Sequence, residues 1–119
     1  MAIKTVIGLD LETTALDPAA GEIIEVAAIR YDWETGHEVA RLVQLCRAAA
    51  PLTETIQQLT GIKDALLADK PFFKEILGPL KDFIGTDIVF AHNAPFDMGW
   101  LKEHGLKITN PVWDTFPLA

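Results

Sequence analysis

Three closely spaced segments in the first 47 residues constrain the fold most strongly. They are rich in Val, Ile and Leu, as β-strands are, and they cover residues 4–12, 22–32 and 37–47. The link between the second and third segments is short and ends in Gly36, which favours an antiparallel hairpin. Pro18 and Gly21 predict a turn between the first and second segments. The chain is therefore expected to begin with antiparallel strands.

After residue 50 the apolar residues recur at helical spacing. Short helical turns are expected within 51–61 and 62–69, with Thr53 as an N-cap and Gly61 as a stop. A longer helical pattern covers 70–85, and Gly78 and Pro79 are predicted to kink or split it.

The last third of the chain alternates strand and helix signals. The apolar segment 87–92 predicts a fourth strand, and a helix capped by Asn93 is expected over 94–105. Val112 and Trp113 predict a short last strand, and a further helix is expected to begin at the following Asp-Thr. At 119 residues the chain is long enough for one small α/β domain with a mixed, partly parallel sheet.

Charge and hydropathy exclude several classes of function. Seventeen acidic against ten basic residues give a net charge of −7, which argues against a broad basic surface for nucleic acid. An anionic substrate would need metal ions or a local basic groove. No apolar run approaches the roughly 18 residues of a membrane span, and the start "MAIKTV" resembles no secretory signal. We therefore expect a cytoplasmic protein without a membrane partner, in which the single Cys46 is a core residue.

Two carboxylates end the first predicted strand. Side chains alternate along a strand, so Asp10 and Glu12 share one face. Like charges at this spacing raise a pKa unless a cation lies between them, and hard oxygen ligands select Mg²⁺ or Mn²⁺. The alternative is a solvated strand end that leads into a turn.

A third carboxylate, Asp97, lies in the first turn of the helix that follows the fourth strand. The helix dipole favours an anion there, so a purely structural role is the alternative. If the first and fourth strands are parallel neighbours, however, Asp97 meets Asp10 and Glu12 at the carboxyl ends of the strands. Three such carboxylates suit two-metal phosphoryl chemistry.

Five segments in this order resemble the DEDD superfamily of 3′-to-5′ exonucleases, specifically its proofreading-exonuclease-like group: "GLDLETTALDP", "EIIEVAAIRYD", "LTGI", "FAHNAPFDMGWL" and "WDTFPLA". The resemblance implies a ribonuclease-H-like α/β fold, in which strand–helix units add parallel strands to three antiparallel strands. It also implies a metal-dependent hydrolase that releases nucleoside monophosphates from the 3′ end of single-stranded nucleic acid, with DNA favoured over RNA.

The same resemblance assigns roles to individual residues. Asp10, Glu12 and Asp97 would be catalytic ligands of two Mg²⁺ or Mn²⁺ ions. The terminal nucleotide would contact Thr13, Thr14, Leu16, His92, Asn93 and Phe96. The competing interpretations are turn residues for the threonines, core positions for Leu16 and Phe96, and a helix cap for Asn93.

The chain departs from the family pattern in two ways. Ala15 stands where a glycine commonly follows the threonines, and it would be strained if that position needed a positive φ. The histidine base and fourth carboxylate of the third family motif do not occur before Ala119. We therefore expect residues 1–119 to be one incomplete exonuclease domain that lacks its C-terminal helices and is weak or inactive alone. His104 lies about 10 Å beyond Asp97 along the helix, too far to replace the base.

Two other interpretations stay open at this stage. The chain could be a non-catalytic module with the exonuclease fold that docks nucleic acid or protein, with a polymerase or helicase as its partner. It could also associate with itself through a sheet surface that the missing helices leave uncovered.

Overall fold

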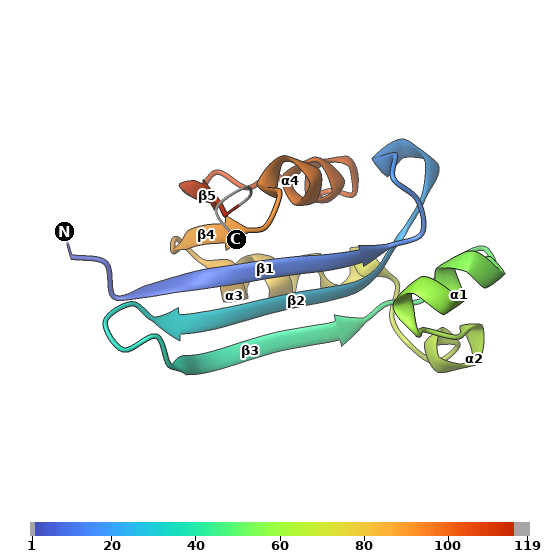
Figure 1. Ribbon diagram of the computed structural model, residues 1–119, viewed down its shortest axis with the longest axis horizontal. Coiled ribbons are helices and arrows are strands. Elements are labelled where there is room, and N and C mark those ends of the chain that lie inside the picture. The colour runs from blue at the N-terminus through green and yellow to red at the C-terminus, as the bar shows by residue number, and fades with distance from the viewer. Residues whose placement is uncertain (1, 116–119) are drawn as a thin grey trace.

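A mixed five-stranded sheet forms the centre of the computed structural model, which describes residues 2–115 (Figure 1). Its strands are β1 Thr5–Thr13, β2 Ile23–Asp32, β3 Glu38–Leu45, β4 Ile88–Ala91 and β5 Val112–Asp114. The order across the sheet is β3-β2-β1-β4-β5. The β1–β2 and β2–β3 pairs are antiparallel, and the β1–β4 and β4–β5 pairs are parallel. The expected ribonuclease-H-like α/β sheet is therefore confirmed.

The helices occupy one face and one end of this sheet (Figure 1). They are η1 Pro18–Ala20, α1 Glu54–Thr60, α2 Asp64–Leu67, η2 Phe73–Ile76, α3 Leu77–Ile84 and α4 Ala94–Glu103. The α1 helix begins and ends as predicted. Thr53 Oγ1 accepts a hydrogen bond from the Ile56 amide, and Gly61 ends the helix in the left-handed region with a φ of 75°.

The main core lies between the sheet and the helices α3 and α4. Strand alternation turns Ile7, Leu9 and Leu11 of β1 toward it, where they pack with Leu80 of α3 and Trp100 of α4. Cys46 is fully buried in the same core, as predicted. Burial raises the pKa of its thiol to about 12, so the side chain behaves as a small apolar group.

A second, smaller core holds α1 and α2 at the carboxyl end of β1. A β-bulge between Glu12 and Thr13 makes it possible, because the pairing with β2 skips one residue there. Ile23 consequently faces the main core, while Ile24 packs with the second core. The bulge lies at the end of β1 that carries the predicted catalytic carboxylates.

The predicted helical segment 70–85 is split, but not at Gly78 and Pro79. A 3₁₀ turn, η2, ends at Ile76, and α3 begins at Leu77. Gly78 and Pro79 therefore lie inside the first turn of α3. Proline is tolerated there because the first amides of a helix have no acceptor within it.

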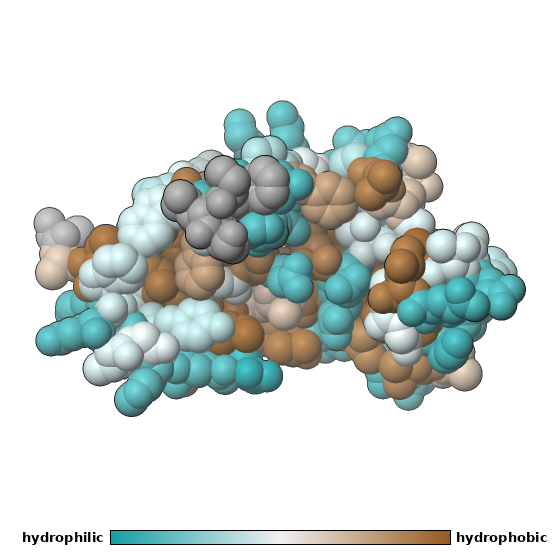
Figure 2. Space-filling model, in the orientation of Figure 1, coloured by the Kyte–Doolittle hydropathy of each residue, from teal (hydrophilic) through white to brown (hydrophobic). Residues whose placement is uncertain are grey.

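The second face of the sheet is covered by no helix of the described part of the chain. Aromatic side chains lie on this face, with Tyr31 and Phe90 6.0 Å apart and Trp33 and Trp113 5.4 Å apart between ring centroids. Hydrophobic residues are visible between polar ones on this side in Figure 2. No helix within residues 2–115 has the length and apolar character to cross a membrane. The helix expected after Asp114 falls on residues outside the described range.

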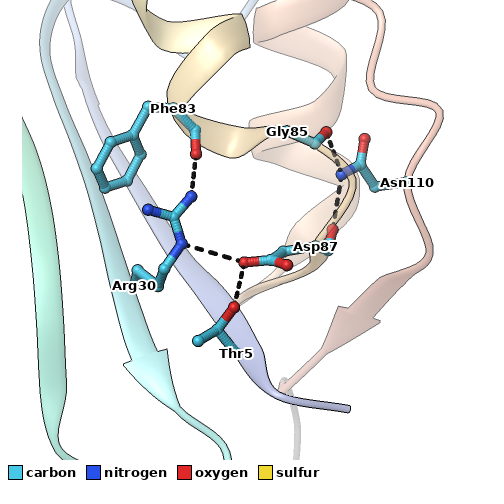
Figure 3. Close-up of polar contacts among 6 residues, drawn as sticks. All are labelled: Thr5, Arg30, Phe83, Gly85, Asp87 and Asn110. Carbon is cyan, nitrogen blue, oxygen red and sulfur yellow. Dashed lines mark hydrogen bonds and ion pairs between the residues drawn. The ribbon is translucent and has the colours of Figure 1, made fainter. Parts of the chain in front are cut away.

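A polar network fixes the amino ends of β1 and β4 (Figure 3). Asp87 Oδ2 accepts hydrogen bonds from Thr5 Oγ1 at 2.7 Å and from Arg30 Nε at 3.2 Å. A terminal guanidinium nitrogen of Arg30 donates to the Phe83 carbonyl at the end of α3, and the Asn110 amide donates to the Asp87 carbonyl. One half-buried carboxylate thus joins β1, β2 and β4.

Replacing Asp87 should destabilise the fold. Asp87→Ala removes the acceptor of two hydrogen bonds and leaves Arg30 without its ion-pair partner, so we expect the free energy of unfolding to fall by about 1–2 kcal/mol. Urea denaturation measures the change. The matched control is Asp69→Ala, which removes an 81 % exposed carboxylate paired with Lys70 and should change stability by less than about 0.5 kcal/mol. Equal effects of the two substitutions would contradict this role.

Candidate active site

Two of the three predicted metal ligands project from the end of β1 onto the open face of the sheet. Asp10 is exposed, and its Oδ1 accepts a hydrogen bond from the next amide, Leu11. Glu12 is half-buried and lies directly opposite Glu25 of β2. Strand alternation and the antiparallel register therefore place three acidic side chains on one face.

The third predicted ligand, Asp97, arrives from a neighbouring strand–helix unit. The β4 strand runs parallel to β1, with Gly8 opposite Phe90, and α4 begins three residues after β4 ends. Asp97 lies in the first turn of α4 and is only 4 % exposed. It is the only buried charged side chain within the described range.

The carboxylates interact electrostatically. Burial, then the charge of Asp10, then that of Asp114 raise the pKa of Asp97 to about 7. Burial raises the pKa of Glu12, with smaller contributions from Asp10 and Glu25. The charge of Asp10 thus raises the pKa of a carboxyl on its own strand, β1, and of a carboxyl on α4, so the three groups interact electrostatically.

The donor chemistry of this cluster fits a hard divalent cation. Asp10, Glu12 and Asp97 offer oxygen donors only, and none of the ion pairs found among residues 2–115 uses them. Within the same residues, no three or more Asp, Glu, His or Cys side chains are close enough together to hold a metal ion. The backbone brings the carboxylates into one region, while their side chains do not form a ready-made cage.

Asp114, the last residue of β5, lies near Asp97, and the sequence did not predict it as a site residue. Its Oδ1 accepts hydrogen bonds from the amides of Asn93 at 3.0 Å and Ala94 at 3.2 Å. It therefore caps α4 from a neighbouring strand, and it contributes to the raised pKa of Asp97. The available signal was its position at the carboxyl end of a predicted parallel strand.

The prediction that the Asn93 side chain caps α4 is wrong. Asn93 occupies the N-cap position, but its side chain makes no capping hydrogen bond. Its backbone has a φ of 63°, the only positive φ of a non-glycine residue in the described range. Asparagine tolerates this left-handed conformation better than most residues do. Asn93 therefore makes the turn from β4 into α4, and the cap comes from Asp114.

A pocket of about 430 Å³ lies beside Glu12 and contains three of the six predicted substrate residues, Thr13, Leu16 and Phe96. Its remaining lining comes from β1, the following loop and α1: Leu11, Glu12, Ala15, Ile56, Leu59 and Thr60. Leu16 is 86 % exposed, so the interpretation of Leu16 as a core residue is wrong. The pocket has the size and the largely apolar wall of a small-ligand site.

The other predicted substrate residues lie elsewhere. The Thr14 hydroxyl accepts a hydrogen bond from the Glu22 amide and so belongs to the base of a loop. His92 lines a separate hollow on the open sheet face, together with Asp10. Asn93 makes the turn described above. Ala15 has no positive φ, so the strain considered for this departure from the family glycine does not occur.

The buried Asp97 should make stability depend on pH. Its pKa is higher in the folded than in the unfolded state, so its contribution to stability is present below about pH 4 and is lost as pH rises through about 7. Relative to Asp97→Asn, the free energy of unfolding of the unsubstituted chain should fall by on the order of 2–4 kcal/mol between about pH 4 and 8. Urea denaturation of both proteins at several pH values measures this difference in the free energy of unfolding. Parallel stability curves for the two proteins would refute the assignment.

Known proteins of similar sequence and structure identify this arrangement. A family model described as RNase T, exonuclease, matches residues 7–119. DNA polymerase III PolC-type of Bacillus cereus is 37% identical over 124 aligned residues, which cover 100% of this chain and 8% of that protein. The chain thus spans about 8% of the length of such curated relatives.

Solved structures share the fold. Exonuclease X in complex with 5′ overhanging duplex DNA matches with a TM-score of 0.74 and 27% identity, over 96% of this chain and 61% of that one. E. coli exonuclease I in complex with an oligonucleotide matches with a TM-score of 0.80 and 19% identity, over 97% of this chain and 29% of that one. The chain therefore belongs to the RNase T exonuclease family, a family of DEDD-type 3′-to-5′ exonucleases that hydrolyse phosphodiester bonds.

Proposed function

We propose that residues 1–119 belong to a metal-dependent exonuclease domain that removes nucleoside monophosphates from the 3′ end of single-stranded nucleic acid, with DNA as the preferred substrate. The observation that carries this proposal is the shared electrostatic environment of Asp10, Glu12 and Asp97 at the carboxyl ends of two parallel strands. Such a group of carboxylates carries an unfavourable charge unless cations neutralise it.

Asp10, Glu12 and Asp97 would hold two Mg²⁺ or Mn²⁺ ions. When bound, such ions lower the pKa of a water nucleophile and stabilise the leaving oxygen of a phosphodiester. The protein contributes the position of the donors: β1 fixes Asp10 and Glu12, and the buried first turn of α4 fixes Asp97. The ions would also supply the positive charge that phosphate binding requires in a chain of net charge −7.

The pocket beside Glu12 supports a single-stranded substrate end. Its volume of about 430 Å³ is large enough to accommodate one unpaired nucleotide. Leu16 and Phe96 offer apolar surface to a base, and Thr13 lies beside Glu12 where the sugar would follow. Exonuclease I bound to an oligonucleotide and exonuclease X bound to duplex DNA support DNA as the substrate class.

The isolated chain is expected to cleave slowly. Rapid hydrolysis also needs a group that accepts the proton of the attacking water. His37 is exposed after the β2–β3 turn, and the ring of His104 is bound to the Pro18 carbonyl, so neither is placed beside Asp97. The third histidine, His92, lines the open-face hollow with Asp10, but its Nδ1 is engaged by Thr115 Oγ1 at 3.4 Å. This is the reason to expect weak activity from residues 1–119 by themselves.

The PolC-type relatives suggest a partner and a location for this domain. Because the chain matches about 8% of a protein named DNA polymerase III PolC-type, we propose a polymerase as its functional partner and the cytoplasm as its location. A helicase is the alternative partner. The open sheet face with Tyr31, Phe90, Trp33 and Trp113 also supports self-association, which sedimentation at increasing protein concentration tests.

Digestion of an end-labelled single strand tests the activity. With Mg²⁺ or Mn²⁺, we expect shortening from the 3′ end, and Asp10→Ala should slow it by about 100-fold or more because one ion loses a ligand. Asp82→Ala is the matched control, since Asp82 is exposed on α3. Cleavage by Asp10→Ala at the rate of the unsubstituted chain would contradict the proposal.

A second function, that of a non-catalytic docking module, is favoured by one observation: the carboxylates of the described range form no ready-made metal cage. Titration with Mn²⁺ separates the two functions. If the domain is an exonuclease, we expect at least one weak Mn²⁺ site. Its affinity for Mn²⁺ should rise as pH rises through about 7, because Asp97 must lose its proton before it binds a metal. Asp97→Asn should weaken this site and flatten its pH dependence. Absence of any Mn²⁺ binding would favour the docking module.

A further inference from the structure

Three rings line one face of α4 and form what we call the aromatic ladder: Phe96, Trp100 and His104. They are four residues apart, so successive rings lie above one another on the helix. The ring centroids of Phe96 and Trp100 are 6.1 Å apart. Those of Trp100 and His104 are 5.3 Å apart, with planes within 9° of parallel. The ladder begins at the proposed nucleotide pocket, which Phe96 lines, and ends at the C-cap of α4.

The loop of residues 14–22 packs against the far end of this ladder. His104 Nε2 lies 3.0 Å from the Pro18 carbonyl oxygen. A carbonyl only accepts hydrogen bonds, so Nε2 carries the hydrogen and donates it. In this way the last ring of the ladder holds the tip of the loop to α4.

The middle ring holds the same loop by close packing. Trp100 is fully buried, and a Cβ added to Gly21 would lie 3.0 Å from Trp100 Cη2 and 2.8 Å from Ala15 Cβ. Gly21 has an extended backbone with a φ of −146°, so lack of space, rather than backbone conformation, requires glycine here. The loop therefore fits against Trp100 without room for another methyl group.

The base of the loop is closed by the residues at its two ends. The Thr14 amide donates to the Glu22 carbonyl at 3.0 Å, and the Glu22 amide donates to Thr14 Oγ1 at 2.8 Å. The Glu22 carboxylate in turn accepts the amides of Ala49 and Ala50. Leu16, by contrast, is 86 % exposed, so the position of this pocket residue depends on how the rest of the loop is held.

We propose that His104 is a positioning residue of the exonuclease site: its hydrogen bond to Pro18 fixes loop 14–22 against α4 and thereby sets the place of Leu16 relative to Phe96 in the nucleotide pocket. The proposal rests on the proposed function. By this proposal α4 has two roles. Its first turn carries Asp97, and the residue at its C-terminal end fixes the loop that borders the pocket.

A pair of substitutions separates the hydrogen bond from the ring. His104→Phe keeps a ring to stack on Trp100 but removes the donor, and His104→Gln keeps a donor without the ring. Binding is measured with oligo-dT carrying a phosphorothioate at its 3′-terminal linkage, in Mn²⁺. We expect His104→Phe to weaken binding by about three- to tenfold, the effect of one lost hydrogen bond, and His104→Gln to restore part of it. Mn²⁺ affinity should stay unchanged in both variants, since His104 is no ligand.

The control is His37→Phe, which alters an exposed histidine after the β2–β3 turn and should bind oligo-dT like the unsubstituted chain. Amide hydrogen exchange provides a readout without nucleic acid. His104→Phe should speed exchange of the Thr14 and Ala20 amides, which are bonded at the base and within the loop, by about three- to tenfold while leaving the middle of α4 unchanged. Gly21→Ala should have the same effect by displacing the loop from Trp100.

The outcomes distinguish this proposal from the proposed function. If the unsubstituted chain binds no oligo-dT, the proposed function fails, and hydrogen exchange still decides whether His104 holds the loop. Oligo-dT binding and loop exchange in His104→Phe that both equal those of the unsubstituted chain would overturn the proposal. A loss of Mn²⁺ affinity in His104→Phe would overturn it as well, because His104 would then act on the metal ligands rather than on the loop.

Discussion

The parallel pairing of β1 with β4 is the interaction on which the rest of the site depends. It joins segments about 80 residues apart, with Gly8 opposite Phe90. A Cβ at Gly8 would lie 2.8 Å from Phe90 Cζ, so glycine leaves room for the aromatic ring on the open face. Because both strands end at the same edge of the sheet, Asp10 and the helix that carries Asp97 reach the same place.

Acidic side chains have different partners at the two ends of this strand pair. At the amino end, Asp87 is matched by Arg30 and by the Thr5 hydroxyl. At the carboxyl end, burial and neighbouring acids raise the pKa of Asp97 to about 7 and also raise that of Glu12. Crowding carboxylates together costs stability, whereas the Asp87 network contributes stability at the opposite end.

The α4 helix positions both Asp97 and the loop beside the pocket. Its first turn buries Asp97, its N-terminus is capped by Asp114 from β5, and its last residues hold loop 14–22. The pocket beside Glu12 lies between this helix, α1 and the start of the loop. The position of Asp97 and one wall of this pocket are consequently set by the same helix.

The sequence by itself determined the features that depend on local periodicity and residue type. Alternating apolar residues define the strands and place Asp10 and Glu12 on one face, Thr53 and Gly61 bound α1 through their own short-range geometry, and the motif spacing identifies the family. Only the tertiary structure decided which distant groups meet. Glu25 faces Glu12, Asp114 caps α4 in place of the Asn93 side chain, and His104 reaches Pro18. These contacts join residues 13 to 86 positions apart, and the packing of the strands and helices, not the local sequence around either partner, brings them within hydrogen-bonding or electrostatic range.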